Sequence, residues 1–343
     1  MSIPVGPADL TPGWLSEALG TPVTSASVTP VGTGQTGSSH RVVVTYAEPT
    51  ELPASFVAKL GAEDPEVRAR VAHGYRAEVA FYDRIAPTVD VPVPRCFASR
   101  ISDDGTVFAL LLEDLAPAQQ GDQIAGCSPD IVVRGAAALA GLHGPRWCDP
   151  MWKDLDVLTL PLVDEQTAPG MGDLVRMATD VFLSTLGDRM SAQDRQTLDA
   201  VPGKIPAWLL ACPERFALLH GDYRLDNLML GPGGTVTVVD WQTLAVGLPA
   251  RDLAYWITTS VEPADRKAVE GQAISAYHER LAVDGYDLVT CEQDYRLGQL
   301  HVPLIATLGW AFTTQTARGG DMMLAMVRRS CAALRDLGSL ELL

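Results

Sequence analysis

The chain changes character near residue 114, and this change limits the folds open to it. Before that point, short segments rich in Val and Thr are separated by Gly or Pro, as in SASVTPV, HRVVVTYA and ASFVAKL. Such segments are typical of an antiparallel meander. VDVPVPRCFASR and TVFALLLEDL predict two more strands, and the second is almost wholly apolar, which favours a central place in its sheet.

Helices are predicted before, within and after this strand-rich region. Thr11 followed by Pro12 predicts a short first helix. Between Pro65 and Ile85 apolar residues recur at three- and four-residue steps, which predicts one helix among the strands, with Gly74 as a candidate break. Further helices are predicted over residues 128–144, 171–200, 263–282, 292–312 and 321–336, with HGDYRLDNLML and TVTVVDWQ as the only strand-like island among them.

These patterns and the length of 343 residues predict an α+β fold in two lobes that share a cleft. The N-terminal lobe is expected to hold the sheet and its embedded helix in residues 1–113. The C-terminal lobe is expected to be larger and mainly helical, in residues 114–343.

Charge and cysteine content exclude several classes of protein. With 42 acidic and 26 basic residues the formal charge is −16, which argues against unspecific nucleic-acid binding. The six cysteines lie far apart and form no CxxC, which fits a reducing cytosol. The N-terminal residues lack the basic start and apolar core of a signal peptide, and no uncharged apolar run reaches membrane-spanning length. We therefore expect a soluble cytoplasmic protein with no membrane partner.

The segment VGTGQTGSSHRV places Gly32, Gly34 and Gly37 in a GxGxxG spacing. A dinucleotide-binding fingerprint would open a helix, whereas a Val-rich strand follows here, which argues against an NAD-dependent enzyme. The context favours a glycine-rich hairpin that folds over nucleotide phosphates. A plain flexible hairpin is the alternative.

Lys59 stands at the end of the apolar strand ASFVAKL, where an ammonium group is costly unless it faces an anion. Glu78 lies on the helix predicted to follow. A Lys on a strand paired with a Glu on the next helix positions phosphates in kinases. Two unrelated surface charges are the alternative.

FALLLEDLAP ends an apolar strand where the composition turns helical, and we interpret it as the linker between the lobes. The backbone from Glu113 to Leu115 is then a candidate for hydrogen bonds with an adenine edge. Solvated hinge carboxylates are an equally good interpretation of Glu113 and Asp114.

Three polar residues lie close to apolar segments in HGDYRLDNLML and the following VVDWQ. Asp222 and Asn227 stand five residues apart, and Asp240 ends a β-branched run. A lone buried carboxylate is costly, so these groups either bond one another or hold a cation. The spacing is that of the kinase catalytic loop, where the Asp meets the substrate hydroxyl and the Asn coordinates magnesium. Two protein oxygen ligands plus nucleotide phosphates are sufficient for Mg²⁺.

HGDYRLDNLML followed by VVDWQ resembles the Brenner-type motif of the aminoglycoside phosphotransferase and choline kinase-like family, a branch of the protein-kinase-like fold. The order of the motifs matches that family over roughly residues 30–256. The resemblance implies ATP and Mg²⁺ as cofactors, Asp222 as catalytic base, Asn227 and Asp240 as metal ligands, and Lys59 with Glu78 as the phosphate-positioning pair. Trp241 stands where protein kinases carry Phe, and their APE signature is missing, so small-molecule substrates are favoured over proteins.

The phosphate acceptor is the least constrained prediction. LLLEDLAPAQQGD also resembles the subgroup that includes ecdysteroid kinase-like proteins, and the acidic residues of the helical region are spread through it. We therefore expect a hydroxyl of a neutral or weakly charged metabolite to be phosphorylated. An aminoglycoside O-phosphotransferase is one alternative, and a nucleotide-binding pseudokinase is another, although it would be expected to lack Asp222 or Asp240.

Overall fold

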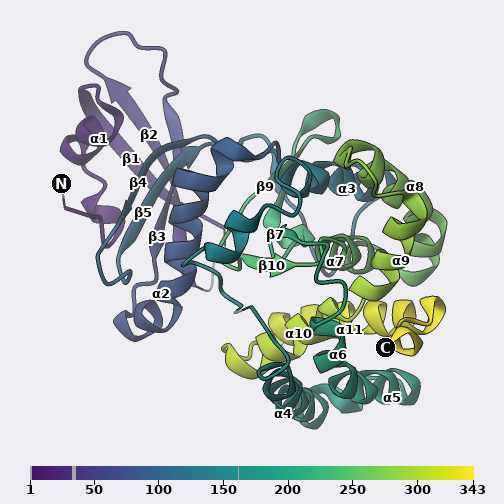
Figure 1. Cartoon of the computed structure of the whole chain (residues 1–343). Coiled ribbons are helices and arrows are strands. Elements are labelled where there is room, and N and C mark those ends of the chain that lie inside the picture. Colours follow the sequence, from purple (N-terminus) through teal and green to yellow (C-terminus); the bar gives the residue numbers. More distant parts are fainter. Residues whose placement is uncertain (1, 33–35, 161) are drawn as a thin grey trace.

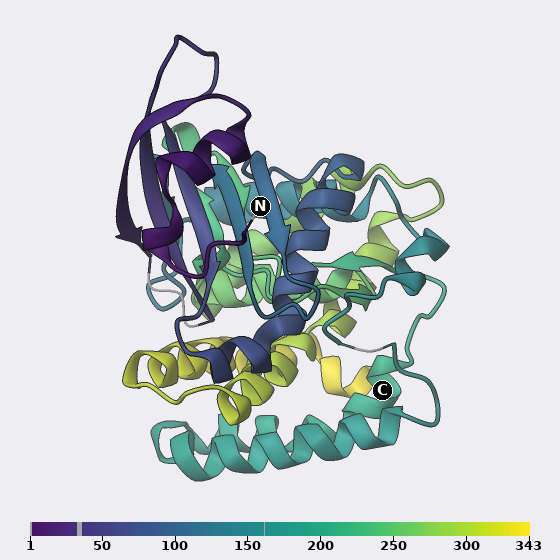
Figure 2. The same cartoon turned by 90° about the vertical axis from the view of Figure 1, so that its left-hand side faces the viewer.

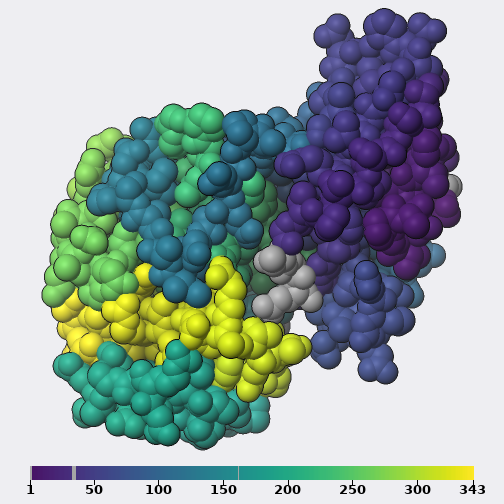
Figure 3. All heavy atoms as spheres, turned by 180° about the vertical axis from the view of Figure 1, so that it is seen from behind, coloured from purple at the N-terminus to yellow at the C-terminus, as the bar shows by residue number. Residues whose placement is uncertain are grey.

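The computed structural model describes residues 2–32, 36–160 and 162–343. An antiparallel sheet with two helices forms one part of the molecule, and a larger helical body forms the other (Figures 1 and 2). In the space-filling view of Figure 3 the sheet part projects from the helical body as a separate mass. The α+β architecture expected from the sequence is therefore present.

The sheet consists of β1 (Val23–Val31), β2 (Gly37–Tyr46), β3 (Ser55–Gly61), β4 (Cys96–Ile101) and β5 (Phe108–Glu113). Their order is β1-β2-β3-β5-β4, and every neighbouring pair is antiparallel. The almost wholly apolar strand β5 lies between β3 and β4, as its composition predicted. The first helix, α1 (Pro12–Leu19), is capped by Thr11, whose side chain accepts a hydrogen bond from the backbone N–H of Trp14 at 3.2 Å.

The embedded helix α2 (Pro65–Ala80) continues into one wide helical turn at Phe81–Ile85. The expected break at Gly74 is wrong, because α2 runs through that residue without interruption. A Cβ atom on Gly74 would lie 3.3 Å from the backbone oxygen of Gln242. The glycine therefore permits a close approach between α2 and the segment after Asp240, and it does not divide the helix.

The helical body contains α3 (Pro129–His143), α4 (Ala168–Leu186), α5 (Ala192–Ala200), α6 (Ile205–Leu209), α7 (Ala250–Ser260), α8 (Pro263–Leu281), α9 (Leu288–Gly298), α10 (His301–Phe312) and α11 (Ala317–Leu337). Two of the predicted helices are each divided into two helices in the structure. The range 171–200 is divided between α4 and α5, and the range 292–312 is divided between α9 and α10. The chain restarts at Ser191, whose hydroxyl caps α5 by accepting from the N–H of Asp194. None of the helices in the described ranges is both long and apolar enough to cross a membrane.

Short strands carry the conspicuous polar motifs. The hairpin β8 (Leu228–Leu230) and β9 (Val236–Val238) pairs with the two-residue strand β6 (Gln119–Gln120), and β7 (Ala217–Leu219) pairs with β10 (Ala245–Gly247). The loop with Asp222 and Asn227 connects β7 to β8, and Asp240 follows β9. Because β8 and β9 are paired, the loop before β8 and the segment after β9 lie side by side, next to the sheet.

The two parts share one hydrophobic core. The ring of Phe81, just after α2, stacks on Trp241 with a centroid distance of 3.6 Å and an interplanar angle of 5°. Both side chains are fully buried. Because Trp241 follows Asp240 directly, this contact fixes the segment after β9 against the helix that carries Glu78.

Candidate active site

A cavity of about 380 Å³ is lined by residues of both parts. The sequence predicted several of the residues around it. The predicted site residues in its lining are Gly32, Gly37, Lys59, Glu78, Glu113, Leu115, Asn227 and Asp240. Gly34 lies outside the described residues. Asp222 is not in the lining, but it contacts Asn227, which is.

One end of the cavity is an apolar slot beside the linker. Val31, Val57 and Leu112 of the sheet contribute to it, as do Met229 and Val239 of the helical body. The linker residues 113–116 lie at its edge. Apolar walls with backbone amide and carbonyl groups at one edge suit a flat heteroaromatic ring.

The polar end is organised around the Lys59 ammonium. Its Nζ lies 2.7 Å from Glu78 Oε2 and 2.9 Å from Asp240 Oδ1. Burial acts to lower the pKa of Lys59, but Asp240 and Glu78 raise it above its ordinary value, so the ammonium is retained. The predicted contact between Lys59 and Glu78 is present, and Asp240 is a second partner that the sequence did not suggest.

The two carboxylates around Lys59 differ in access. The Glu78 side chain is 1% exposed, whereas that of Asp240 is 40% exposed. Burial raises the pKa of Glu78 against the opposite effect of Lys59. For Asp240, burial also acts to raise the pKa, but the Lys59 ammonium holds it below its ordinary value. Asp240 is therefore the ionised, accessible carboxylate of the pair.

Asp240 also has an unusual backbone, with a φ of 67°. A non-glycine residue in this region costs about 1 to 3 kcal/mol and persists where its surroundings enforce it, often at functional sites. Here the stacked Trp241 follows directly, and Lys59 holds the carboxylate. The turn directs Asp240 into the cavity and not along the strand.

The side chain of Asp222 has three neighbours. Arg224 Nε donates to both carboxylate oxygens at 2.9 Å, and the Tyr255 hydroxyl donates to Oδ1 at 2.7 Å. Asn227 Nδ2 donates to Oδ2 at 2.9 Å and to the backbone oxygen of Asp222 at 2.8 Å. Since these bonds use only the amide nitrogen of Asn227, its Oδ1 remains a possible metal ligand at the cavity wall.

Asp226 makes contacts that hold the loop in place. Its Oδ2 accepts from Arg224 Nη1 at 2.8 Å, and its Oδ1 accepts from the backbone N–H of Gln123 at 2.9 Å. Arg224 thus links the carboxylates of Asp222 and Asp226 from within the same loop.

The backbone of the loop is fixed from α7. The buried carboxylate of Asp252 accepts from the N–H of His220 at 2.7 Å and from that of Gly221 at 3.1 Å. Gly221 has a φ of 80°, and a Cβ atom there would lie 2.2 Å from the backbone oxygen of Thr243. Only glycine fits this position, so the residue before Asp222 is restricted by sterics and by hydrogen bonding together.

Gln242 connects the sheet part with the segment after Asp240. Its Nε2 donates to Glu78 Oε2 at 3.2 Å, and its Oε1 accepts from the Thr36 hydroxyl at 2.9 Å. Sequence reasoning assigned no role to Gln242 or Tyr255, because their partners lie more than 30 residues away.

The assembled groups suit a polyanion held with a divalent cation. Lys59 carries positive charge, while the side chains of Asp240 and Asn227 carry oxygen atoms of the hard type that Mg²⁺ prefers. Phosphate oxygens and water would complete its coordination. The described residues contain no cluster of three or more His, Cys, Asp or Glu side chains arranged as a metal site.

Comparison with known proteins gives a family match. A family model described as "Phosphotransferase enzyme family" matches residues 35–287. The rat protein acyl-CoA dehydrogenase family member 11 is 26% identical over 242 residues, which cover 64% of this chain and 28% of that protein. The chain thus spans little more than a quarter of the length of this curated relative.

Solved structures resemble the whole fold at low sequence identity. The microcompartment-associated aminopropanol kinase aligns with a TM-score of 0.55 and 17% identity, over 96% of this chain and 99% of that chain. The GDP complex of aminoglycoside 2′-phosphotransferase-IIIa gives 0.57 and 14%, over 89% and 92%. Ethanolamine kinase from Plasmodium vivax gives 0.53 and 14%, over 89% and 82%.

These structures confirm the predicted two-lobed, kinase-like α+β fold. The family match extends over more than two thirds of the sequence, from the glycine-rich segment to beyond α8. The chain therefore belongs to the phosphotransferase enzyme family, whose kinase members act on hydroxyl groups of small molecules.

Proposed function

We propose that the protein is an ATP- and Mg²⁺-dependent kinase that transfers the γ-phosphoryl group to a hydroxyl of a neutral or weakly charged metabolite. One observation carries the proposal: Lys59, Glu78, Asp240 and Asn227, which come from four separate elements, meet at one cavity with an apolar slot. Nucleotide binding would be shared by an N-terminal lobe of residues 1–113 and a C-terminal lobe of residues 114–343.

Each residue has a role that its surroundings support. The glycine-rich segment with Gly32 and Gly37 would cover the phosphates, and the backbone from Glu113 to Leu115 would bind the adenine edge. Lys59, oriented by Glu78, would hold phosphate oxygens. Asn227 and Asp240 would hold Mg²⁺. The bound ion would neutralise the charge that develops on the phosphoryl group.

Asp222 is the proposed general base. Its carboxylate would orient the acceptor hydroxyl and receive its proton as the hydroxyl oxygen forms the new bond to phosphorus and ADP leaves. Tyr255 and Asn227 hold this carboxylate by hydrogen bonds, so it has a defined orientation before the acceptor binds. Positioning and electrostatics supply most of the catalysis in such transfers.

The related proteins have several acceptors. Aminopropanol and ethanolamine are small amino alcohols, and a structure of a related aminoglycoside phosphotransferase contains kanamycin. GDP in the aminoglycoside phosphotransferase complexes makes GTP an alternative phosphate donor. The linker sequence LLLEDLAPAQQGD supports the ecdysteroid kinase-like subgroup and hence an acceptor that carries little charge.

The direct test is ADP release with a library of hydroxylated acceptors, run with MgATP, with MgGTP and with ATP plus EDTA. We expect turnover with ATP that EDTA abolishes, and an Asp240→Ala variant that binds MgATP at least roughly tenfold more weakly by calorimetry. Kanamycin turnover that falls steeply with added salt would instead favour the aminoglycoside alternative. A protein that binds MgATP but phosphorylates no acceptor and hydrolyses no ATP would favour the pseudokinase.

A further inference from the structure

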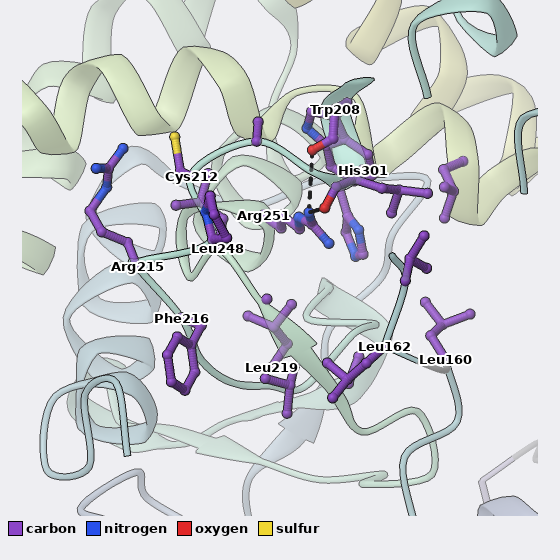
Figure 4. Close-up of a pocket in the computed structure, with 18 of the residues that line it drawn as sticks. Leu160, Leu162, Trp208, Cys212, Arg215, Phe216, Leu219, Leu248, Arg251 and His301 are labelled. Atoms are coloured by element: carbon purple, nitrogen blue, oxygen red, sulfur yellow. Dashed lines mark hydrogen bonds between the residues drawn. The ribbon is translucent and has the colours of Figure 1, made fainter. Parts of the chain in front are cut away.

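A second cavity, of about 240 Å³, lies in the helical body between β7, β10, α6 and α10 (Figure 4). Its walls are mostly aliphatic and aromatic. Leu160 and Leu162 line it from the segment before α4, and Leu219, Leu248 and Leu304 line it from the other elements. We call it the basic pocket, because of the charged residues described next.

The charge of the basic pocket is opposite to that of the chain. Its lining includes Lys153, Arg215 and Arg251 and, in the part of the chain that the structure describes, no Asp or Glu. The whole protein carries 42 acidic and 26 basic residues. A cavity with a basic lining and no carboxylate in its described lining repels cationic ligands. The basic pocket therefore disfavours a polycation, although the protein as a whole is acidic.

Two of the three basic side chains already have partners. Arg215 forms a bidentate ion pair with Asp294, with Nε and Nη2 each 2.8 Å from a carboxylate oxygen. Lys153 is exposed, and its ammonium lies 4.0 Å from the centre of the Phe216 ring. Neither group therefore has charge that is both buried and uncompensated.

Arg251 differs from both. Its guanidinium stacks on the Trp208 ring at 4.2 Å, and its Nη2 lies 3.5 Å and 3.4 Å from the backbone oxygens of Trp208 and Leu209. These bonds are long, and the buried Nε has no partner within the described residues. Asp252 is its neighbour in the chain, but the Asp252 carboxylate bonds the loop at His220 and Gly221.

The electrostatic consequence is a cation that has no ion-pair partner among the described residues. Burial lowers the pKa of Arg251 to about 10, although Asp252 acts in the opposite direction. The group stays protonated at neutral pH, so its charge is unfavourable in this place unless an anion binds. An anionic ligand is the chemical class that would relieve this cost.

The basic pocket adjoins the loop that carries Asp222. His301 lines the pocket, and its Nε2 lies 3.0 Å from the backbone oxygen of Gly221. On α7, Arg251 precedes by one turn Tyr255, which donates to Asp222. These two contacts place the basic pocket beside the backbone of the loop that carries Asp222.

We infer that the basic pocket binds the anionic end and apolar chain of the phosphate acceptor, an amphipathic hydroxylated molecule with a single carboxylate or comparable anion. The inference rests on the proposed function only in calling the ligand an acceptor. The preference of the basic pocket for an apolar anion follows from Arg251 and the lining residues alone. The inference also gives the sign of the weak charge proposed for the acceptor, which is negative.

Binding without nucleotide tests the pocket separately from catalysis. Calorimetric titration of the full chain with sodium octanoate, 1-octanol and octylamine compares three equal chains that differ in head-group charge. We expect octanoate to bind at least roughly tenfold more tightly than octanol, and octylamine to bind most weakly. Equal affinities for octanoate and octanol, or a preference for octylamine, would overturn the inference.

Two kinds of variant locate the site. Arg251→Gln removes the charge and should reduce octanoate affinity to that of octanol, while the surface variant Arg134→Gln should leave both unchanged. Leu162 is 46% exposed, so changes there leave the fold intact. Leu162→Glu should weaken octanoate binding, and Leu162→Lys should strengthen it. Equal effects of the two Leu162 variants would contradict an anion site even if Arg251→Gln does not fold.

The results also separate this inference from the proposed function. If octanoate binds as expected and no acceptor is phosphorylated, the basic pocket stands and the kinase proposal fails. If uncharged alcohols are phosphorylated at rates that Arg251→Gln does not change, and octanoate does not bind, the kinase proposal stands and the basic pocket is rejected. Phosphorylation of ω-hydroxyoctanoate that Arg251→Gln slows and Arg134→Gln does not would support both.

Discussion

Lys59 and Arg251 are partly buried cations in the two cavities, and they differ in their partners. Lys59 is paired with Glu78 and Asp240 at 2.7 Å and 2.9 Å, whereas no carboxylate of the described chain forms an ion pair with Arg251. The cavity around Lys59 is rich in carboxylates, and the basic pocket has none in its described lining. The first cavity therefore suits an anion accompanied by a metal cation, and the second suits an anion that binds directly.

The largest predicted effect tests whether Asp222, which lies next to the carboxylate-rich cavity, is the catalytic base. Asp222→Asn keeps the shape of the side chain but cannot accept the hydroxyl proton. General-base contributions are on the order of 10²- to 10⁴-fold, so turnover should fall at least about a hundredfold with nearly unchanged nucleotide affinity. Single-turnover ADP release measures this, with the surface variant Asp130→Asn as the control. Full activity in Asp222→Asn would remove Asp222 from the mechanism.

The second prediction compares how much Lys59 and Arg251 contribute to the free energy of unfolding. Lys59→Met leaves the buried Glu78 without its counter-ion and should lower the free energy of unfolding by about 3 kcal/mol at neutral pH. Arg251→Met leaves no carboxylate behind and should change it by less than about 1 kcal/mol. Chemical denaturation of both variants measures the difference. Equal losses would mean that Arg251, too, depends on a carboxylate partner.

The Lys59→Met effect should also depend on pH. Burial already raises the pKa of Glu78 above its ordinary value of 4.5, and the loss of Lys59 raises it further. A carboxyl group with a raised folded-state pKa stabilises the fold below its unfolded pKa, and this stability is lost as the pH rises through the folded-state pKa. The deficit of Lys59→Met relative to the unmodified protein should therefore grow between pH 5 and pH 8. A constant deficit would exclude Glu78 as its cause.

The smallest predicted effect concerns the residue between the two cavities. Tyr255→Phe removes one hydrogen bond to the Asp222 carboxylate and leaves the ring in place. The loss of about 1 kcal/mol corresponds to a roughly fivefold lower kcat. Because the phenol acts through Asp222, KM for ATP should not change. A change in KM for ATP with constant kcat would assign Tyr255 to nucleotide binding instead.

Sequence patterns predicted the elements of the fold well where the signal is local. The five strands follow from their Val, Thr and Leu content, and the order of β5 within the sheet follows from its apolar sequence. Gly74 was misinterpreted because its reason is a contact with Gln242, which lies far along the chain. The joined prediction over 292–312 failed similarly, since Gly298 packs against the backbone of Ala250 and a new helix begins at His301.

The candidate site shows the same division. Asp222, Asn227, Asp240, Lys59 and Glu78 stand in motifs with recognisable spacing, and the structure places these residues around or next to one cavity. Gln242, Tyr255 and Arg251 stand in no such pattern, and their contacts depend on how α2, α7 and α6 pack. Packing between distant segments is a property that composition and periodicity do not contain.

The bond between Thr36 and Gln242 has a consequence for how quickly the nucleotide cavity can open. Among the described residues of the glycine-rich segment, this is the side-chain hydrogen bond that reaches across to the helical body. One such bond contributes only about 1 kcal/mol, so its rupture presents a low barrier. Thr36 can therefore separate from Gln242 while Lys59 stays bound to Glu78 and Asp240, so a nucleotide bound as we propose could leave without loss of the ion pairs around Lys59.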